Sequence, residues 1–296
     1  MESFFRNVGS QYFHLIERGQ RDQVTLEVRS FDGREIVDLV LREARGTILM
    51  SGFLSPPNVY RDLMLYKANQ TCLKEFDPPF PRKNRLILAA KDVSSEFKRR
   101  TDQMLDKWKK YIEAISDSSR GNLAVFFTSY QLMRRVASSM ETNRAIIMEE
   151  PDTRRNDVIQ KLTHSNNSIL YGVMGGKLSE GMDYPHNVLK GVVAVGLPYA
   201  TWDAYQESLV DYLEQQFPGN GRTYAYLTPA ILRLVQACGR VHRSAEDKGY
   251  IVILDDRAIQ HYVRRLLPSY FQKEMITVEN PSDCARQIER FTLQVA

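Results

Sequence analysis

The 296-residue sequence is poor in the residues that mark disulfide-bonded and metal-binding proteins. Its three cysteines, Cys72, Cys238 and Cys284, are far apart and odd in number. They therefore form neither a disulfide framework nor a set of metal ligands. The five histidines are scattered, with no pair at the spacing that places two ligands on one helix face. We expect no metal site in this chain.

Long apolar stretches are also missing. The longest runs, such as residues 191–197, have the length of a strand, well below the roughly 20 residues of a membrane-spanning helix. The N-terminus lacks the apolar core of a signal peptide. These absences predict an intracellular protein without membrane contact, in the cytoplasm of a prokaryote or the nucleus of a eukaryote.

The charge balance is weakly informative as a whole. A net charge of +4 does not by itself indicate a nucleic-acid partner. Basic residues nevertheless gather at 98–100 and 107–110 around one expected helix. Such a cluster either contacts phosphates or forms a solvated helix face, and both interpretations stay open.

Short apolar runs alternate with helical stretches along most of the chain, and the runs are continuous rather than alternating. That pattern predicts an α/β fold with a mostly parallel sheet covered by helices on both faces. Residues 1–19 are expected to form a short helix that Gly19 ends, and residues 20–296 a single domain. Expected strands lie at 24–28, 47–50, 86–90, 123–127, 145–148, 168–173, 191–197 and 250–254, and expected helices at 35–43, 101–115, 131–140, 154–164, 202–217 and 281–293.

One stretch, Q-A-C-G-R-V-H-R at 236–243, has a spacing that suits a charged ligand. We expect a helix that starts with Thr228 as N-cap and Pro229 in the first turn, and that continues through this stretch. Gln236, Arg240 and Arg243 would then fall at i, i+4 and i+7 on one face.

Gly239 lies within that face and would let it approach a ligand closely. Two permanently charged guanidinium groups suit a polyphosphate whose charge grows during reaction. The alternative is a solvated arginine face on a surface helix.

Thr128, Ser129 and Tyr130 follow the clearest expected strand. The carboxyl ends of parallel strands are where such folds bind ligands, and the start of the next helix offers free N–H groups to a phosphate. The tyrosine could stack on a base or instead pack into the core.

The glycine-rich segment 175–183, G-G-K-L-S-E-G-M-D, is not a phosphate-binding P-loop. That loop requires G-x-x-x-x-G-K-[ST], and here Tyr171 occupies the first glycine position and Leu178 the hydroxyl position. Asp255 and Asp256 after an apolar run mimic a metal-binding carboxylate pair, but without a P-loop they are best interpreted as a strand end.

Four segments of the chain resemble motifs of the XPD/DinG branch of superfamily 2 helicases. Q-x-x-G-R-x-x-R at 236–243 resembles the last motor motif, and G-K-x-S-E-G-x-D at 176–183 and V-F-F-T-S-Y at 125–130 match two others. S-G-F-L-S-P at 51–56 departs once, because Phe53 stands where the family generally has Thr. The resemblance spans about residues 24 to 275.

The resemblance implies a RecA-like second motor domain, with ATP bound in a cleft against a first motor domain. It implies arginine fingers at Arg240 and Arg243, a γ-phosphate contact at Gln236, and a nucleotide-side role for Gly239, Glu180, Gly181 and Asp183. It also implies contact with single-stranded DNA through Ser51, Thr128, Ser129, Tyr130, Lys177 and Ser179.

The sequence contains no P-loop, no D-E-A-H-like box and no four-cysteine set. By resemblance, Mg²⁺, most ATP contacts and an iron–sulfur cluster belong to the first motor domain. We expect half of an ATP-dependent 5′–3′ DNA helicase that lacks ATPase activity alone, with repair or transcription proteins as further partners. The alternative is a non-catalytic RecA-like module that binds nucleic acid or docks a partner.

Overall fold

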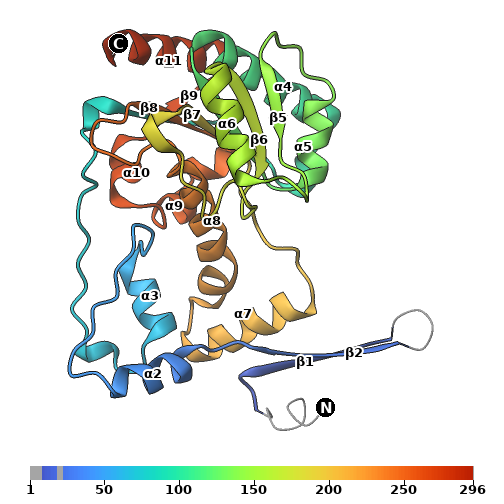
Figure 1. The fold of residues 1–296 in the computed structure, drawn as a ribbon. Coiled ribbons are helices and arrows are strands. Elements are labelled where there is room, and N and C mark those ends of the chain that lie inside the picture. Colours follow the sequence, from blue (N-terminus) through green and yellow to red (C-terminus); the bar gives the residue numbers. More distant parts are fainter. Residues whose placement is uncertain (1–8, 19–22, 296) are drawn as a thin grey trace. The chain divides into compact units, whose positions relative to one another are not determined.

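The computed structural model describes residues 9–18 and 23–295, and the chain divides into two compact units (Figure 1). Unit 1 comprises Met1–Glu75 and Tyr199–Pro229, and unit 2 comprises Phe76–Pro198 and Ala230–Ala296. This division does not coincide with the expected one, a lead-in to residue 19 followed by a single domain.

Unit 2 is built on a seven-stranded sheet in the order β5-β6-β4-β7-β8-β3-β9. Every pairing in it is parallel, which confirms the predicted α/β fold class. The strands are β3 (Arg85–Ala90), β4 (Asn122–Phe127), β5 (Ala145–Met148), β6 (Ser168–Val173), β7 (Leu189–Val195), β8 (Gly249–Leu254) and β9 (Ile276–Val278).

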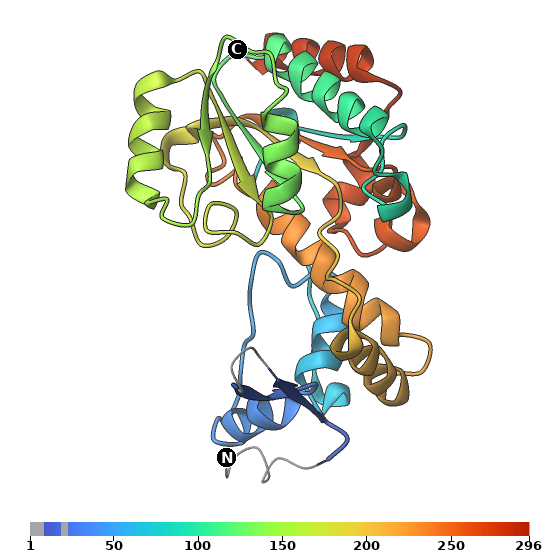
Figure 2. The same ribbon diagram turned by 90° about the vertical axis from the view of Figure 1, so that its right-hand side faces the viewer.

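Helices cover both faces of this sheet, which explains why its central strands are continuous apolar runs. Against one face, Trp108 and Tyr111 pack with strand residues such as Val125. The helices there are α4 (Asp102–Ser118), α5 (Tyr130–Ala137) and α11 (Pro281–Val295), with α11 beside α4 (Figure 2). On the other side lies α6 (Arg155–Ser165). This unit also contains α9 (His261–Arg264), α10 (Ser269–Glu274) and, from Ala230 onward, α8 (Thr228–Cys238).

Unit 1 has a small core of its own, formed by Val59, Tyr212, Leu213, Tyr224 and Ala225. Its elements are the antiparallel pair β1 (Tyr12–Arg18) and β2 (Val24–Ser30), and the helices α2 (Arg34–Arg42), α3 (Pro57–Met64) and α7 (Ala204–Gln216).

The expected helix over residues 1–19 is wrong where the structure can test it. Residues 12–18 form β1, while residues 1–8 and 19 lie outside the described part. Strand β1 pairs along its whole length with β2, from Tyr12 opposite Ser30. The Phe13 ring lies 5.4 Å from the Tyr205 ring. A partner strand and an aromatic contact therefore override a pattern that also fits an amphipathic helix.

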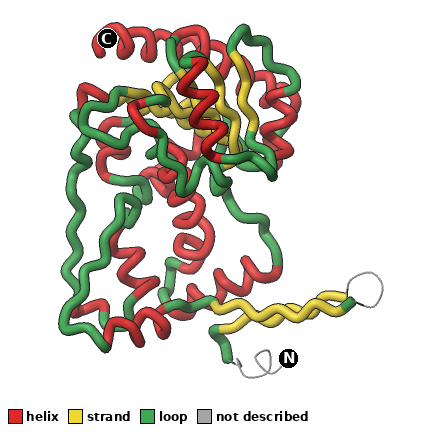
Figure 3. The backbone as a smooth tube through the Cα atoms, in the orientation of Figure 1, coloured by secondary structure: helices red, strands yellow, loops and turns green. Residues whose placement is uncertain are grey.

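The expected buried strand at 47–50 is also wrong. The chain between α2 and α3 is loop in this stretch (Figure 3), and Ile48 and Met50 are each 86% exposed. A β-strand needs backbone hydrogen bonds from a neighbour, and no strand in the described ranges pairs with this segment.

Helix α8 differs from its prediction at both ends. A π-helical turn, Thr223–Leu227, runs directly into it, and Thr228 has helical backbone angles (φ −58°, ψ −46°) rather than those of an N-cap. Because Pro229 has no N–H to donate, one backbone hydrogen bond of a regular helix is missing here, and the turn before it is widened into a π-helical turn. The helix ends at Cys238, so Arg240 and Arg243 lie beyond it.

Candidate functional site

Polar side chains gather where the strands of unit 2 end. Thr128 follows β4, Glu149 follows β5 and Asp255 follows β8. Because the strands are parallel, their carboxyl ends lie at one edge of the sheet, the usual ligand-binding edge of this architecture.

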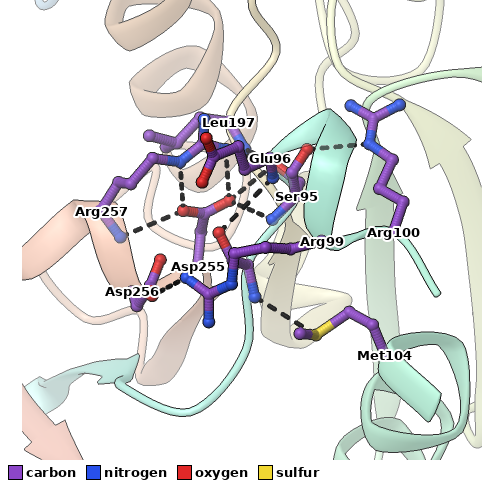
Figure 4. A network of polar contacts seen from close by, with 10 residues as sticks. Ser95, Glu96, Arg99, Arg100, Met104, Leu197, Asp255, Asp256 and Arg257 are labelled. Atoms are coloured by element: carbon purple, nitrogen blue, oxygen red, sulfur yellow. Dashed lines mark hydrogen bonds and ion pairs between the residues drawn. The ribbon is translucent and has the colours of Figure 1, made fainter.

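Asp255 is the centre of a buried polar network at this edge (Figure 4). Its carboxylate accepts bonds from the backbone N–H and the hydroxyl of Ser95, at 2.9 and 2.6 Å. Arg257 donates to both carboxylate oxygens at 2.8 Å. Ser95 Oγ also accepts a bond from the Leu197 N–H, 3.0 Å away. The network thus links the ends of β3, β7 and β8.

Burial alone would raise the pKa of Asp255, but the ion pair with Arg257 and the Ser95 bonds outweigh it and lower that pKa. Asp255 is therefore a buried, paired carboxylate. Its position directly after β8 agrees with the interpretation as a strand end.

The two predicted arginine fingers meet one backbone carbonyl. Arg240 Nη1 and Arg243 Nη2 donate to the Met182 oxygen at 2.6 and 2.8 Å. Arg240 Nε also donates to the Gln236 carbonyl at 3.0 Å. The shared-face prediction is wrong because the helix stops at Cys238, yet the two guanidinium groups converge on a shared acceptor within the glycine-rich segment.

Arg240 is only 6% exposed, whereas Arg243 lies at the surface. Burial, and secondarily the charge of Arg243, lower the pKa of Arg240. Arg243 Nε lies 3.6 Å from Asp183 Oδ1 in a solvent-exposed ion pair. Gly239 donates its N–H to the Val235 carbonyl at 2.8 Å, which completes the last turn of α8.

The glycine-rich loop presents some of its predicted residues and buries others. Lys177 is exposed, and its amine donates to the Pro151 carbonyl. Ser179 is fully buried, and its hydroxyl donates to the carbonyls of Val173 and Gly176 at 2.8 and 3.2 Å. In this conformation the Ser179 side chain holds the loop and is not available to a ligand.

The remaining nucleotide-side residues lie on the same loop. Glu180 donates its N–H to the Gly176 carbonyl at 3.0 Å. Gly181 has a positive φ of 63°, a conformation that favours glycine. The structure thus brings Glu180, Gly181 and Asp183 onto the segment that Arg240 and Arg243 contact.

The segment after β4 combines a free hydroxyl with a partly exposed ring. Within the described residues, the buried Oγ1 atom of Thr128 has no hydrogen-bond partner. Ser129 caps α5 by accepting the Leu132 N–H at 3.2 Å. Tyr130 is 36% exposed, so it is not a core residue, and its hydroxyl donates to Glu149 Oε1 at 3.3 Å.

Ser51 belongs to unit 1, and the other predicted DNA-contacting residues belong to unit 2. Ser51 is exposed, and its hydroxyl accepts the Phe53 N–H at 3.2 Å.

The sequence interpretation missed Glu149, a fully buried carboxylate at the same edge of the sheet. The signal was present, since Glu149 directly follows an apolar strand, as Thr128 does.

Among the described residues, no group of three or more His, Cys, Asp or Glu side chains could hold a metal ion. In that same part of the chain, no helix has the length and apolar character needed to cross a membrane.

Comparison with known proteins gives one family. The helicase C-terminal domain family matches residues 112–274, more than half of the chain. The chain is 29% identical over 227 residues to the ATP-dependent DNA helicase XPD of Sulfolobus acidocaldarius, covering 74% of this chain and 40% of that protein. It is 28% identical over 255 residues to the ATP-dependent DNA helicase DinG of Photobacterium profundum, covering 80% of this chain and 35% of that protein.

Solved structures give the same result for the fold. A structure titled XPD helicase superposes with a TM-score of 0.66 at 24% identity, over 87% of this chain and 47% of that one. A structure titled as apo XPD gives 0.66 at 25% identity, over 87% and 53%. The chain therefore spans half or less of the two helicases that it matches in sequence. The RecA-like fold is confirmed, and the chain belongs to the helicase C-terminal domain family, in its XPD/DinG-like branch.

Proposed function

We propose that this chain is the second motor domain of an ATP-dependent 5′–3′ DNA helicase and that it completes an ATP site formed with a first motor domain. One observation carries the proposal: Arg240 and Arg243, more than fifty residues away from the glycine-rich loop in sequence, both donate to the Met182 carbonyl within that loop. Two motifs that the family resemblance assigns to the nucleotide side are thus in contact.

The arginines are the chemical centre of the proposal. A backbone carbonyl is a weak acceptor for two guanidinium groups, and a phosphate oxygen is a stronger, charged one. In the assembled site Arg240 and Arg243 exchange the Met182 carbonyl for the phosphates of ATP, and Gln236 contacts the γ-phosphate. This change of acceptor is passed on through Gly239 and through the loop residues Glu180, Gly181 and Asp183. Mg²⁺, and an iron–sulfur cluster where one is present, are held by the first motor domain.

The DNA track runs over the segments that end β4 and β6. Tyr130 stacks on a base, Thr128 and Ser129 face the backbone phosphates at the start of α5, and Lys177 adds a positive charge. Ser51, in unit 1, is proposed as a separate contact with the single strand, while Ser179 acts by holding the loop. The names of the relatives, ATP-dependent DNA helicases XPD and DinG, support DNA as the substrate.

The alternative function, a non-catalytic module that binds nucleic acid or docks a partner, has one observation in its favour. Arg240 is buried and already bonded to two backbone carbonyls. Such an arginine can be a purely structural residue. Phe53, at the position where the family generally has Thr, also favours the non-catalytic module.

Reconstitution separates the two functions. The purified chain is assayed for ATP hydrolysis alone and then with the first motor domain of a full-length relative, with and without single-stranded DNA. We expect no turnover alone and DNA-stimulated turnover after mixing. DNA binding that is unchanged by the added domain, with no turnover, supports the module.

Repair or transcription proteins are proposed partners of the assembled helicase, since one relative is named as a subunit of a transcription and DNA repair factor.

A further inference from the structure

Glu149 lies between two parts of the candidate site, the segment after β4 and the segment after β6. It follows β5, its side chain is fully buried, and it forms no ion pair within residues 9–18 and 23–295. One oxygen, Oε2, accepts the Val173 N–H at 2.9 Å. The other, Oε1, accepts the Tyr130 hydroxyl at 3.3 Å. A single carboxylate therefore connects the aromatic residue after β4 to the start of the glycine-rich loop.

The loop backbone is packed directly against this carboxylate. A Cβ at position 176 would lie 2.7 Å from Oε1 and 2.9 Å from Oε2 of Glu149, and a Cβ at position 172 would lie 2.9 Å from Oε2. All three distances are shorter than a side-chain carbon allows. The glycines at 172 and 176 therefore make room for Glu149.

Val173, the last residue of β6, and Gly176 also organise the glycine-rich loop. Val173 accepts the Gly176 N–H and the Ser179 hydroxyl, both at 2.8 Å. Gly176 in turn accepts the Glu180 N–H at 3.0 Å. A shift of the carboxylate would consequently displace the backbone that carries Lys177 and Glu180.

We infer that Glu149 is a positioning residue that couples Tyr130 to the glycine-rich loop, so that a single strand bound at Tyr130 fixes the loop on the nucleotide side. This inference rests on the proposed function for the identity of the ligands. The coupling itself is a property of the free chain. When a base stacks on the Tyr130 ring, the Tyr130 hydroxyl is held against Oε1 of Glu149. The Glu149 carboxylate is thereby held against the Val173 N–H.

Hydrogen–deuterium exchange of residues 173–183 in the full chain measures this coupling without any ligand. Tyr130→Phe keeps the ring and removes only the bond to Glu149. We expect it to speed loop exchange by about fivefold, the effect of losing one net hydrogen bond. Glu149→Ala is expected to speed exchange at least as much, and the double variant no more than Glu149→Ala alone. Glu150→Ala, at a half-buried neighbour whose carboxylate pairs with Arg134, is the matched control and leaves the loop unchanged.

If the two increases in exchange rate multiply in the double variant, Glu149 acts on the loop independently of Tyr130. That result overturns the inference. Should Glu149→Ala fail to fold, Glu149→Gln replaces it in the same cycle, since an amide keeps the shape and one acceptor oxygen. Where both variants fold, Glu149→Gln is expected to exchange more slowly than Glu149→Ala, because its one acceptor oxygen can still take the Val173 N–H.

An oligothymidylate added to the same samples tests the link to the ligand. We expect it to slow loop exchange in the unmodified chain and not in Tyr130→Phe, although both bind it. Equal slowing in both chains contradicts the coupling. An oligothymidylate that binds neither chain refutes the proposed DNA track, whereas the ligand-free cycle still decides the role of Glu149.

Discussion

At the residue scale, Asp255 is the buried charge on which the edge of the sheet most depends. It receives bonds from Ser95 and Arg257 and is fully buried. Removing one partner of a buried ion pair is costly because the other charge stays behind. Its neighbour Asp256 forms a more exposed ion pair with Arg99, of the kind that contributes little.

We predict that Asp255→Asn lowers the free energy of unfolding of unit 2 by about 3 kcal/mol, and that Asp256→Asn lowers it by less than about 1 kcal/mol. Urea titration followed through Trp108, the buried tryptophan of unit 2, measures both in a Trp202→Phe background. Equal losses for the two variants would mean that the network does not stabilise the sheet edge.

A second residue-scale prediction concerns pH. His242 is buried, stacks on Phe80 and lies 3.3 Å from the Asn84 carbonyl, which can only accept. Burial lowers the pKa of His242 below its ordinary value of 6.5. The unfolded chain therefore binds a proton in a pH range where the folded chain does not, and stability falls as the pH decreases below about 6.5.

We predict that His242→Gln flattens the decrease in unfolding free energy between about pH 6.5 and pH 5, measured by the same titration. His261→Gln, at an exposed position, serves as control for the loss of an imidazole elsewhere in the chain. An identical slope in all three chains would show that His242 is protonated equally in the folded and unfolded states.

At the element scale, the start of α8 can be tested by a substitution at Thr228. The direction of the change in unfolding free energy shows whether Thr228 is an N-cap. If Thr228 were an N-cap, its hydroxyl would bond to a backbone N–H. Instead its Oγ1 atom is buried and, within the described residues, without a hydrogen-bond partner. Thr101 is a real N-cap that accepts the Met104 N–H.

We predict that Thr228→Val raises the free energy of unfolding by up to about 1 kcal/mol, since it removes an unsatisfied buried hydroxyl. Thr101→Val is predicted to lower it by about 1 kcal/mol. Thermal or urea unfolding measures both. A loss at position 228 equal to that at position 101 would restore the N-cap interpretation.

The elements also show why the sequence predicts some parts and not others. Leu123–Phe127 and Ile169–Val173 are apolar on both sides of the chain, and a strand inside a parallel sheet needs only that property. Residues 12–16 and 47–50 are both largely apolar, but the first run has a partner strand and the second has none among the residues that the structure describes. Pairing between distant segments is not encoded in either run alone.

The candidate site follows the same rule. The resemblance to helicase motifs singled out Arg240, Arg243 and Asp183, and the structure brings all three to one place. The predicted helix face shared by Gln236, Arg240 and Arg243 was wrong, because the end of α8 depends on local turn structure. Glu149 was missed although it directly follows an apolar strand, because its contacts with Val173 and Gly176 join segments that are distant in the sequence.

At the scale of the whole molecule, the decisive question is whether the buried guanidinium group of Arg240 reaches a nucleotide. In the proposed function Arg240 leaves the Met182 carbonyl when a first motor domain brings ATP to it. Fingers of this kind contribute a factor on the order of 10³ or more to the rate. A purely structural arginine would instead affect stability.

The most direct measurement is the DNA-stimulated turnover number of the reconstituted enzyme with Arg240→Ala, compared with Arg265→Ala at an exposed position outside the site. Unfolding of both chains is followed in parallel. We predict that Arg240→Ala lowers the turnover number on the order of 10³-fold while the chain stays folded, and that Arg265→Ala leaves it unchanged. Turnover by folded Arg240→Ala within about threefold of the unmodified chain would contradict the assignment of Arg240 as an arginine finger.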